Sequence, residues 1–204
     1  MASQVSLIGI AGIPLVVPGD DLPALLVAAL RRDGIVPVAG DAFVVTSKIV
    51  SKAEGCVVDL RTITPSPEAI ELAARTDKEP ELVELVLAES TSIVRAVPGV
   101  LLTRHRLGFT SANAAIDRSN ADGSEHTALL MPLDPDASAR TIRNGLDGSA
   151  ARRRYRELLS PGGGLRWHGS PPHCCRVRRQ HPLLVHVQES VLVNLVVCAS
   201  TRRE

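Results

Sequence analysis

Aromatic residues are almost absent from this 204-residue chain, in which Phe, Tyr and Trp together make up 2% of the residues. Hydrophobic residues still account for 45%, so any core must be packed from Val, Leu, Ile and Ala. No apolar run reaches the roughly 18 residues of a membrane-spanning helix, and the first residues lack the basic segment of a signal peptide. We therefore expect a cytoplasmic protein without membrane partners, whose four cysteines stay reduced.

Aspartate and lysine are both missing from the last quarter of the chain. Residues 1–150 carry 13 Lys and Arg against 19 Asp and Glu, a net charge of −6, whereas residues 151–204 carry ten Arg against three Glu, a net charge of +7. Such an abrupt change of composition indicates a division of the chain. We predict a domain over residues 1–150 and an atypical basic tail over residues 151–204, for which an aberrant or poorly ordered ending is one interpretation.

Patterns typical of strands and helices alternate before the tail. Apolar residues recurring every three or four positions predict helices at residues 19–34, 65–75, 79–90 and 133–146. Short apolar runs predict strands at residues 5–16, 42–46, 56–60, 99–109 and 183–200. Asp20 or Asp21 and, further on, Asp134 are the expected N-caps, with a proline in each first turn. This order predicts an α+β fold, a mixed β-sheet with flanking helices.

Three polar stretches are candidates for chemistry. "GIAGIP" places Gly12 in a tight turn through which backbone N–H groups could approach a phosphate. "SKIVSKAEG" places Lys48 and Lys52 on one side of a helical turn, where they could neutralise phosphates. "SANAAIDRSNADG" offers Asp117 as an oxygen ligand for magnesium or manganese, with Asn113 and Asn120 as amide partners. Taken one at a time, an ordinary turn, surface lysines and a polar loop remain the alternatives.

The basic tail suggests two further kinds of site, and its spacings favour neither. Its His and Cys residues match no Cys-x-x-Cys pair or His-x₃₋₅-His pair, which a structural zinc site would show. Its arginines lack the interleaved aromatic residues of a nucleic-acid surface. We therefore expect no zinc site and no nucleic-acid partner.

Taken in order, five blocks of the sequence resemble one family, the coenzyme F-420:L-glutamate ligases, also called F-420-0:gamma-glutamyl ligases. The blocks are "GIPLVVPGDDL", "VVTSKIVSKAEGCVVDL", "ELVELVLAESTSIVR", "GVLLTRHRLGFTSANAAIDRSN" and "LLMPLDPDASARTIRNGL". Together they extend over about residues 7–147. The resemblance is specific because five blocks follow one another in the family's order and spacing.

The resemblance implies a ligase that joins L-glutamate to a coenzyme F-420 precursor through an acyl phosphate. It would use GTP and magnesium or manganese, be helped by potassium, and act as a homodimer. It implies a nucleotide contact at Ser47 and Lys48, a phosphate-binding and catalytic lysine at Lys52, a metal ligand at Asp117 and a nucleotide contact at Asn120. It also implies a first nucleotide-contacting turn, formed by Gly12, Ile13, Pro14 and Leu15.

The resemblance ends near residue 147, where the family continues with a strand ending in a metal-binding Asp-Thr or Asp-Ser pair and, later, a glutamine-bearing nucleotide motif. Residues 151–204 contain neither. We therefore expect a truncated version of the family fold in which Asp117 is the one remaining metal ligand. Without the other ligands, this chain could be an inactive form of the ligase. The alternative function is a non-catalytic nucleotide-binding or scaffold fragment of the same fold.

Overall fold

A computed structural model of the chain describes residues 4–37, 41–118, 125–148 and 196–202. These residues form two compact units. Unit 1 consists of residues 4–37, 41–55, 132–148 and 196–202. Unit 2 consists of residues 56–118 and 125–131. The predicted boundary at residue 150 lies outside the described residues, so that division of the chain stays a prediction.

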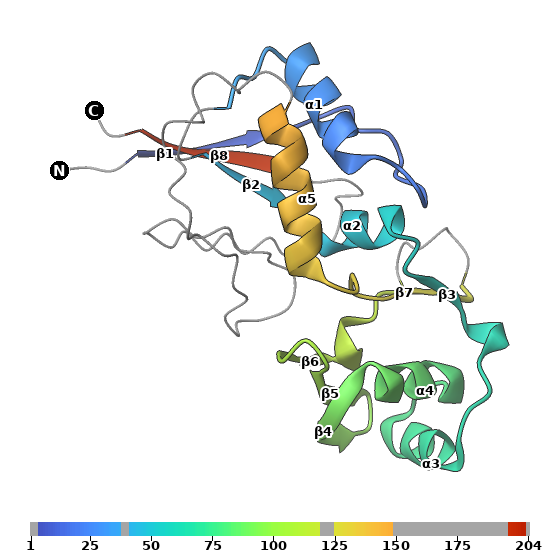
Figure 1. Ribbon diagram of the computed structural model, residues 1–204. Coiled ribbons are helices and arrows are strands. Elements are labelled where there is room, and N and C mark those ends of the chain that lie inside the picture. The colour runs from blue at the N-terminus through green and yellow to red at the C-terminus, as the bar shows by residue number, and fades with distance from the viewer. Residues whose placement is uncertain (1–3, 38–40, 119–124, 149–195, 203–204) are drawn as a thin grey trace. The chain divides into compact units, whose positions relative to one another are not determined.

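Unit 1 combines helices with one small sheet (Figure 1). Its described elements are, in chain order, β1 (Gln4–Gly9), α1 (Leu22–Arg32), β2 (Ala42–Val45), α2 (Ser47–Ala53), α5 (Pro135–Gly148) and β8 (Val196–Arg202). β8 lies between β1 and β2 and is antiparallel to both. A strand from the end of the chain thus forms the centre of this sheet, and it coincides with the last part of the strand predicted at residues 183–200.

The helix ends in unit 1 follow the caps that the sequence predicts. Asp21 caps α1, since its Oδ1 accepts a hydrogen bond from the N–H of Ala24 at 2.9 Å. Asp134 caps α5 in the same way, accepting from the N–H of Ala137 at 2.9 Å. Side-chain caps of this kind satisfy N–H groups that have no partner within the helix. The predicted helices at residues 19–34 and 133–146 are therefore confirmed.

The core of unit 1 is aliphatic, as the composition requires. α1, α2, α5 and the segment after β1 meet in one buried cluster, formed by Ile10, Val16, Leu22, Leu26, Ala29, Leu30, Ile49, Val50 and Ile142. α5 packs against α1 at a close contact between Gly145 and Pro23. The three helices are thereby fixed to one another around the cluster.

Unit 2 packs two helices on a second small sheet (Figure 1). Its described elements are, in chain order, β3 (Val57–Asp59), η1 (Leu60–Thr62), α3 (Pro67–Thr76), α4 (Pro80–Ala88), β4 (Ser90–Val97), β5 (Val100–His105), β6 (Thr110–Ala112), η2 (Asn113–Ala115) and β7 (Thr127–Leu129). β4, β5 and β6 form an antiparallel sheet in that order, and β3 pairs with β7. Alternate residues of β5 face the helices, so that Leu101, Thr103 and His105 are fully buried.

The α+β class is confirmed, and the predicted helices at residues 65–75 and 79–90 appear as α3 and α4. Where the sequence predicts one mixed sheet, the described strands pair antiparallel in three small sheets. Within the residues that the structure describes, no helix is both long enough and apolar enough to cross a bilayer.

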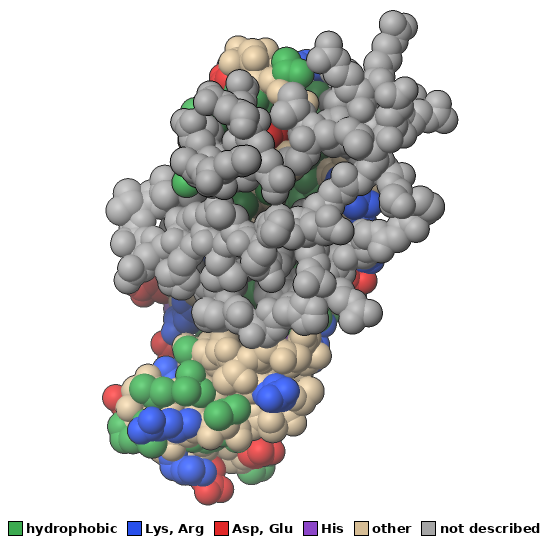
Figure 2. Space-filling model, turned by 90° about the vertical axis from the view of Figure 1, so that its left-hand side faces the viewer, with side chains coloured by type: hydrophobic (Ala, Val, Ile, Leu, Met, Phe, Trp, Pro, Cys, Tyr) green, Lys and Arg blue, Asp and Glu red, His purple; other side chains and the backbone are tan. Residues whose placement is uncertain are grey.

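β4 is an edge strand that reaches the surface on both faces. Ile93 is 41% exposed and Val94 is 56% exposed. Hydrophobic side chains lie at the surface near Lys and Arg side chains in the lower part of Figure 2, which shows unit 2. The register of β4 against β5 shifts twice, between Ser90 and Ser92 and between Ile93 and Arg95. Such irregularities bend a strand and protect an open sheet edge from pairing with other chains.

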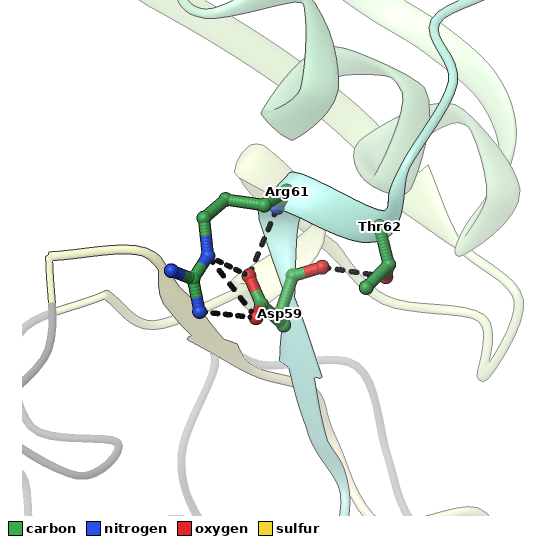
Figure 3. Close-up of polar contacts among 3 residues, drawn as sticks. All are labelled: Asp59, Arg61 and Thr62. Carbon is green, nitrogen blue, oxygen red and sulfur yellow. Dashed lines mark hydrogen bonds and ion pairs between the residues drawn. The ribbon is translucent and has the colours of Figure 1, made fainter.

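Asp59, the last residue of β3, caps the N-terminus of the short helix η1 (Figure 3). Its Oδ1 accepts from the backbone N–H of Arg61 at 3.0 Å, and its Oδ2 accepts from Nη2 of the same arginine at 2.7 Å. Thr62 Oγ1 donates to the carbonyl oxygen of Asp59 at 2.7 Å. These hydrogen bonds from Arg61, first the side chain and then the backbone, lower the pKa of Asp59 from 3.8 to about 2.

We expect the stability of unit 2 to depend on pH through Asp59. Its pKa is lower in the folded than in the unfolded chain, so its contribution is present above the unfolded value of about 4 and is lost as pH falls toward 2. Urea unfolding between pH 6 and pH 2 should therefore show a smaller loss of stability below pH 4 for Asp59→Asn than for the unaltered chain. Identical pH profiles would contradict this role of Asp59.

Candidate functional site

The predicted glycine turn follows β1 and lies between two core residues. Ile10 and Val16 are each 3% exposed, so both ends of the turn are anchored in the cluster of unit 1. Gly12 has a φ of +65°, a conformation that other residues adopt only with strain. Leu15 is 63% exposed. The segment is thus held at both ends with Gly12 in a left-handed conformation, and the tight turn expected at Gly12 stays a prediction.

The predicted lysine segment forms helix α2 directly after β2. Thr46 caps the helix, since its Oγ1 accepts from the N–H of Ile49 at 3.4 Å. Ile49 and Val50 anchor α2 in the hydrophobic cluster. Lys48 and Lys52 are four residues apart on this helix and therefore share a side of it.

Lys52 has an unusual environment for a lysine. Its side chain is 7% exposed, and it is the one Lys, Arg, Asp or Glu that is buried among the described residues. None of the ion pairs between described residues involves it. Its ammonium nitrogen is not one of the buried side-chain atoms without a hydrogen-bond partner, so the apolar stem is buried while the charged end reaches the surface, without an acidic partner among the described residues. An anionic ligand would supply such a partner, and phosphate is an anion that lysine commonly binds in proteins.

The glycine turn and α2 belong to the same part of unit 1. The segment after the turn is bonded to the end of α2, since the N–H of Gly19 donates to the carbonyl oxygen of Ala53 at 2.8 Å. Both elements also contribute to one hydrophobic cluster. Unit 1 therefore contains seven of the predicted site residues, in two segments that pack on the same hydrophobic cluster, namely Gly12, Ile13, Pro14, Leu15, Ser47, Lys48 and Lys52.

Unit 1 also has an open cavity of about 360 Å³ between α1, α2 and α5. Asp20, Glu54 and Asp134 contribute carboxylates to its lining. Each carboxylate has a structural partner: Asp20 accepts from Val17, Asp134 caps α5, and Glu54 accepts from Ser138 Oγ. An acidic lining repels a triphosphate, so we do not assign the nucleotide to this cavity.

Asp117 lies in unit 2, after a backbone turn of unusual conformation. Asn113, Ala114 and Ala115 have φ values of 49°, 51° and 57°. Each non-glycine residue in this region costs about 1–2 kcal/mol, and such strain is often found at functional sites. Asp117 then forms a bridge with Leu129, in which N–H···O distances are 3.0 and 2.8 Å. The turn and the bridge together fix the backbone of Asp117.

The described residues do not supply the ligand set of a divalent metal ion. Magnesium and manganese require several oxygen ligands. Oδ2 of Asp117 is buried, but among the described residues no three Asp, Glu, His or Cys side chains gather where they could hold a metal. Asn120 lies outside the described residues. The metal role of Asp117 and the nucleotide contact of Asn120 stay predictions.

Three side-chain oxygens near this turn are buried without a hydrogen-bond partner: Thr103 Oγ1, Ser111 Oγ and Asn113 Oδ1. Thr103 and Ser111 are directly opposite each other on β5 and β6, and are 0% and 5% exposed. A buried polar atom without a partner destabilises a fold by about 1–3 kcal/mol.

Thr103→Val is therefore expected to stabilise unit 2, by roughly 1 kcal/mol, because valine keeps the shape of threonine and removes the buried hydroxyl. Urea unfolding at neutral pH measures the change. A matched control is Thr110→Val on the exposed side of β6, which should have little effect. A clear loss of stability in Thr103→Val would show that the hydroxyl does have a partner.

Two features of the candidate site were not predicted from the sequence. Arg32, at the end of α1, donates hydrogen bonds to the carbonyl oxygens of Ala11 and Gly12. No local pattern links residues 20 positions apart, so nothing in the sequence identifies this contact. The left-handed turn at Asn113–Ala115 was also missed, because alanine favours right-handed helix.

In the residues described, the chain is thus an α+β protein whose first unit holds a buried lysine and a glycine turn on one hydrophobic cluster. It belongs to the F420-0:gamma-glutamyl ligase family, whose model matches residues 11–153. The resemblance predicted from residues 7–147 is confirmed.

Several curated relatives carry the name coenzyme F420:L-glutamate ligase. The relative from Methanothermobacter thermautotrophicus is 45% identical over 148 residues, which are 72% of this chain and 58% of the relative. The relative from Methanopyrus kandleri is 41% identical over 142 residues, 70% of this chain and 50% of the relative. The relative from Archaeoglobus fulgidus is 40% identical over 140 residues, which are 69% of this chain and 53% of the relative. The chain therefore spans little more than half the length of these relatives.

Proposed function

We propose that this chain serves the reaction named in its relatives, the joining of L-glutamate to a coenzyme F420 precursor, and that it uses GTP to do so. The observation that carries the GTP part is Lys52, a lysine whose stem is buried and whose ammonium group has no acidic partner among the described residues. We further propose that the chain uses Mg²⁺ or Mn²⁺ together with K⁺, forms a homodimer and is cytoplasmic.

The proposed chemistry has two steps. A carboxylate of the precursor first attacks the γ-phosphorus of GTP, forming an acyl phosphate and releasing GDP. The amine of L-glutamate then attacks the acyl carbon, so that the C–N bond of an amide forms, phosphate leaves and the amine loses a proton. Phosphoryl transfer needs positioning and charge stabilisation rather than covalent help from the protein.

Lys52 and the glycine turn have the properties that this first step needs. Negative charge on the γ-phosphate oxygens is stabilised best by a fixed cation in a site that excludes water. The side chain of Lys52 is 7% exposed and its helix is anchored by Ile49 and Val50, so the lysine stem has little conformational freedom left to lose when the nucleotide binds. The N–H of Gly12 is a further donor, which can approach phosphate closely because the residue has no side chain.

A non-catalytic nucleotide-binding or scaffold role is the second candidate. It is favoured by the ligand set around Asp117, which the described residues leave incomplete.

Incubation of this chain with the precursor, GTP, L-glutamate and Mn²⁺, followed by mass spectrometry, separates the two candidates. The ligase predicts a product heavier by one glutamyl residue, whose formation requires both GTP and glutamate. Saturable GTP binding without that product would favour the non-catalytic role. If neither product nor GTP binding is observed, both candidates are wrong.

A further inference from the structure

Arg32 forms a set of contacts with the glycine turn that its position in the sequence does not suggest. It is the last residue of α1. Its Nη1 donates to the carbonyl oxygen of Gly12 at 3.2 Å, and its Nη2 donates to the carbonyl oxygen of Ala11. The neighbouring Asp33 holds the same guanidinium from the other side, with N···O distances of 2.7 Å at Nε and 2.9 Å at Nη2.

The turn is shaped to admit this guanidinium. A Cβ placed on Gly12 would lie 2.1 Å from Nη1 and 2.8 Å from Cζ of Arg32. These separations are far shorter than van der Waals contact, so any larger residue would displace the arginine. Gly12 is thus required both by its φ of +65° and by the approach of Arg32.

The contact also sets the direction of a backbone donor. In a planar trans peptide the carbonyl oxygen and the following N–H point in opposite directions. Because the carbonyl of Ala11 points at Arg32, the N–H of Gly12 points away from it. The same relation orients the peptide between Gly12 and Ile13. Arg32 therefore holds two successive peptide planes with their carbonyl oxygens turned toward itself, so that the N–H of Gly12 points away from the guanidinium.

We propose that Arg32 is a positioning residue for nucleotide binding, which presets the N–H of Gly12 to donate to a phosphate group of a nucleoside triphosphate. This inference rests on the proposed function, since the turn is the predicted nucleotide contact. Carbonyl oxygens facing the ligand would repel phosphate, whereas outward N–H groups attract it. A turn that is ordered in advance also loses less conformational entropy when the ligand binds.

The planar fork of arginine is what the contact requires. The guanidinium donates in fixed, parallel directions to two adjacent carbonyl oxygens and to Asp33, which a lysine ammonium group cannot reproduce. The side chain is 48% exposed, so its attraction to Asp33 is screened and contributes little by itself. Geometry rather than net charge is therefore the expected determinant.

The test compares GTP affinity and thermal stability in the full chain with Arg32→Gln, Arg32→Lys and Arg31→Gln. Arg31→Gln is the matched control, because it removes the same charge from the preceding position of α1. Isothermal titration is expected to give a GTP Kd about tenfold weaker for Arg32→Gln, since losing a charge-assisted hydrogen bond is of that order. Arg32→Lys should be nearly as weak, and Arg31→Gln should bind like the unaltered chain.

The melting temperatures of the variants, and the substitution Gly12→Ala, distinguish a positioning role of Arg32 from a merely structural one. All three variants are expected to keep a melting temperature close to that of the unaltered chain while only the two Arg32 variants lose affinity. Gly12→Ala should weaken binding strongly in the unaltered chain and much less in the Arg32→Gln background, because the clash is then removed.

Full affinity in Arg32→Gln or in Arg32→Lys would overturn the inference, as would an equal loss in Arg31→Gln. An unaltered chain that does not bind GTP would instead contradict the proposed function on which the inference rests. The two failures are therefore distinguishable in one set of titrations.

Discussion

Lys52→Met is expected to abolish most GTP binding without destabilising unit 1. Methionine keeps the apolar stem that lysine packs in the interior and removes the ammonium group. Losing charge-assisted hydrogen bonds to phosphate costs about 2–3 kcal/mol, which corresponds to roughly a 100-fold weaker Kd. The free energy of unfolding should stay about the same, because methionine preserves the packing of the buried stem. Isothermal titration and urea unfolding measure the two quantities.

Lys78→Met is the matched control for this prediction. Lys78 is the one lysine of unit 2, so its loss removes the same charge at a position that has no predicted nucleotide role. GTP affinity should be unchanged. Equal Kd values for Lys52→Met and the unaltered chain would contradict the assignment of Lys52, whatever the stability of the variant.

Gly145→Ala is expected to destabilise unit 1 by about 1–3 kcal/mol, the usual cost of overpacking a filled interior. A Cβ at position 145 would lie 2.3 Å from Cβ and 2.9 Å from Cγ of Pro23. The ring of proline is rigid, so α5 would have to shift away from α1. Ile142, one turn earlier on α5, would then lose contact with the cluster that anchors α2. Urea unfolding should show a lower midpoint.

Asn144→Ala separates this clash from a general effect of alanine in the helix. Asn144 is exposed on α5, and alanine favours helix over both asparagine and glycine. Asn144→Ala should therefore be neutral or slightly stabilising. A Gly145→Ala variant that is also more stable than the unaltered chain would mean that helix propensity outweighs the clash and that α1 and α5 are not closely packed.

The helices and their caps could be predicted from local sequence. Asp21 and Asp134 each precede a proline and an apolar repeat, and both cap a helix in the structure. β4 could not be predicted in this way. It is an edge strand exposed on both faces, with two shifts of register, so it lacks the alternation of apolar and polar residues on which strand prediction depends.

The candidate site could be predicted only in part, because some of its residues lie in short local patterns and others meet only through the tertiary fold. Gly12 and Lys52 lie in short patterns that carry their own chemistry, and the structure places both on one cluster. The contact of Arg32 with Gly12 depends on how α1 returns to the turn after β1, which no local pattern encodes. The left-handed conformation at Ala114 opposes the preference of alanine and is held by tertiary contacts, such as the bridge of Asp117 with Leu129.

Acylation by a GTP acyl phosphate would test the site most directly. Such a probe binds as GTP does and transfers its acyl group to a lysine that lies at the γ-phosphate. The chain has only three lysines, Lys48, Lys52 and Lys78, so peptide mass spectrometry identifies the modified residue without ambiguity. We predict acylation of Lys52 that excess GTP prevents. Acylation of Lys78 alone, or labelling of Lys52 that GTP does not reduce, would contradict a nucleotide site on α2.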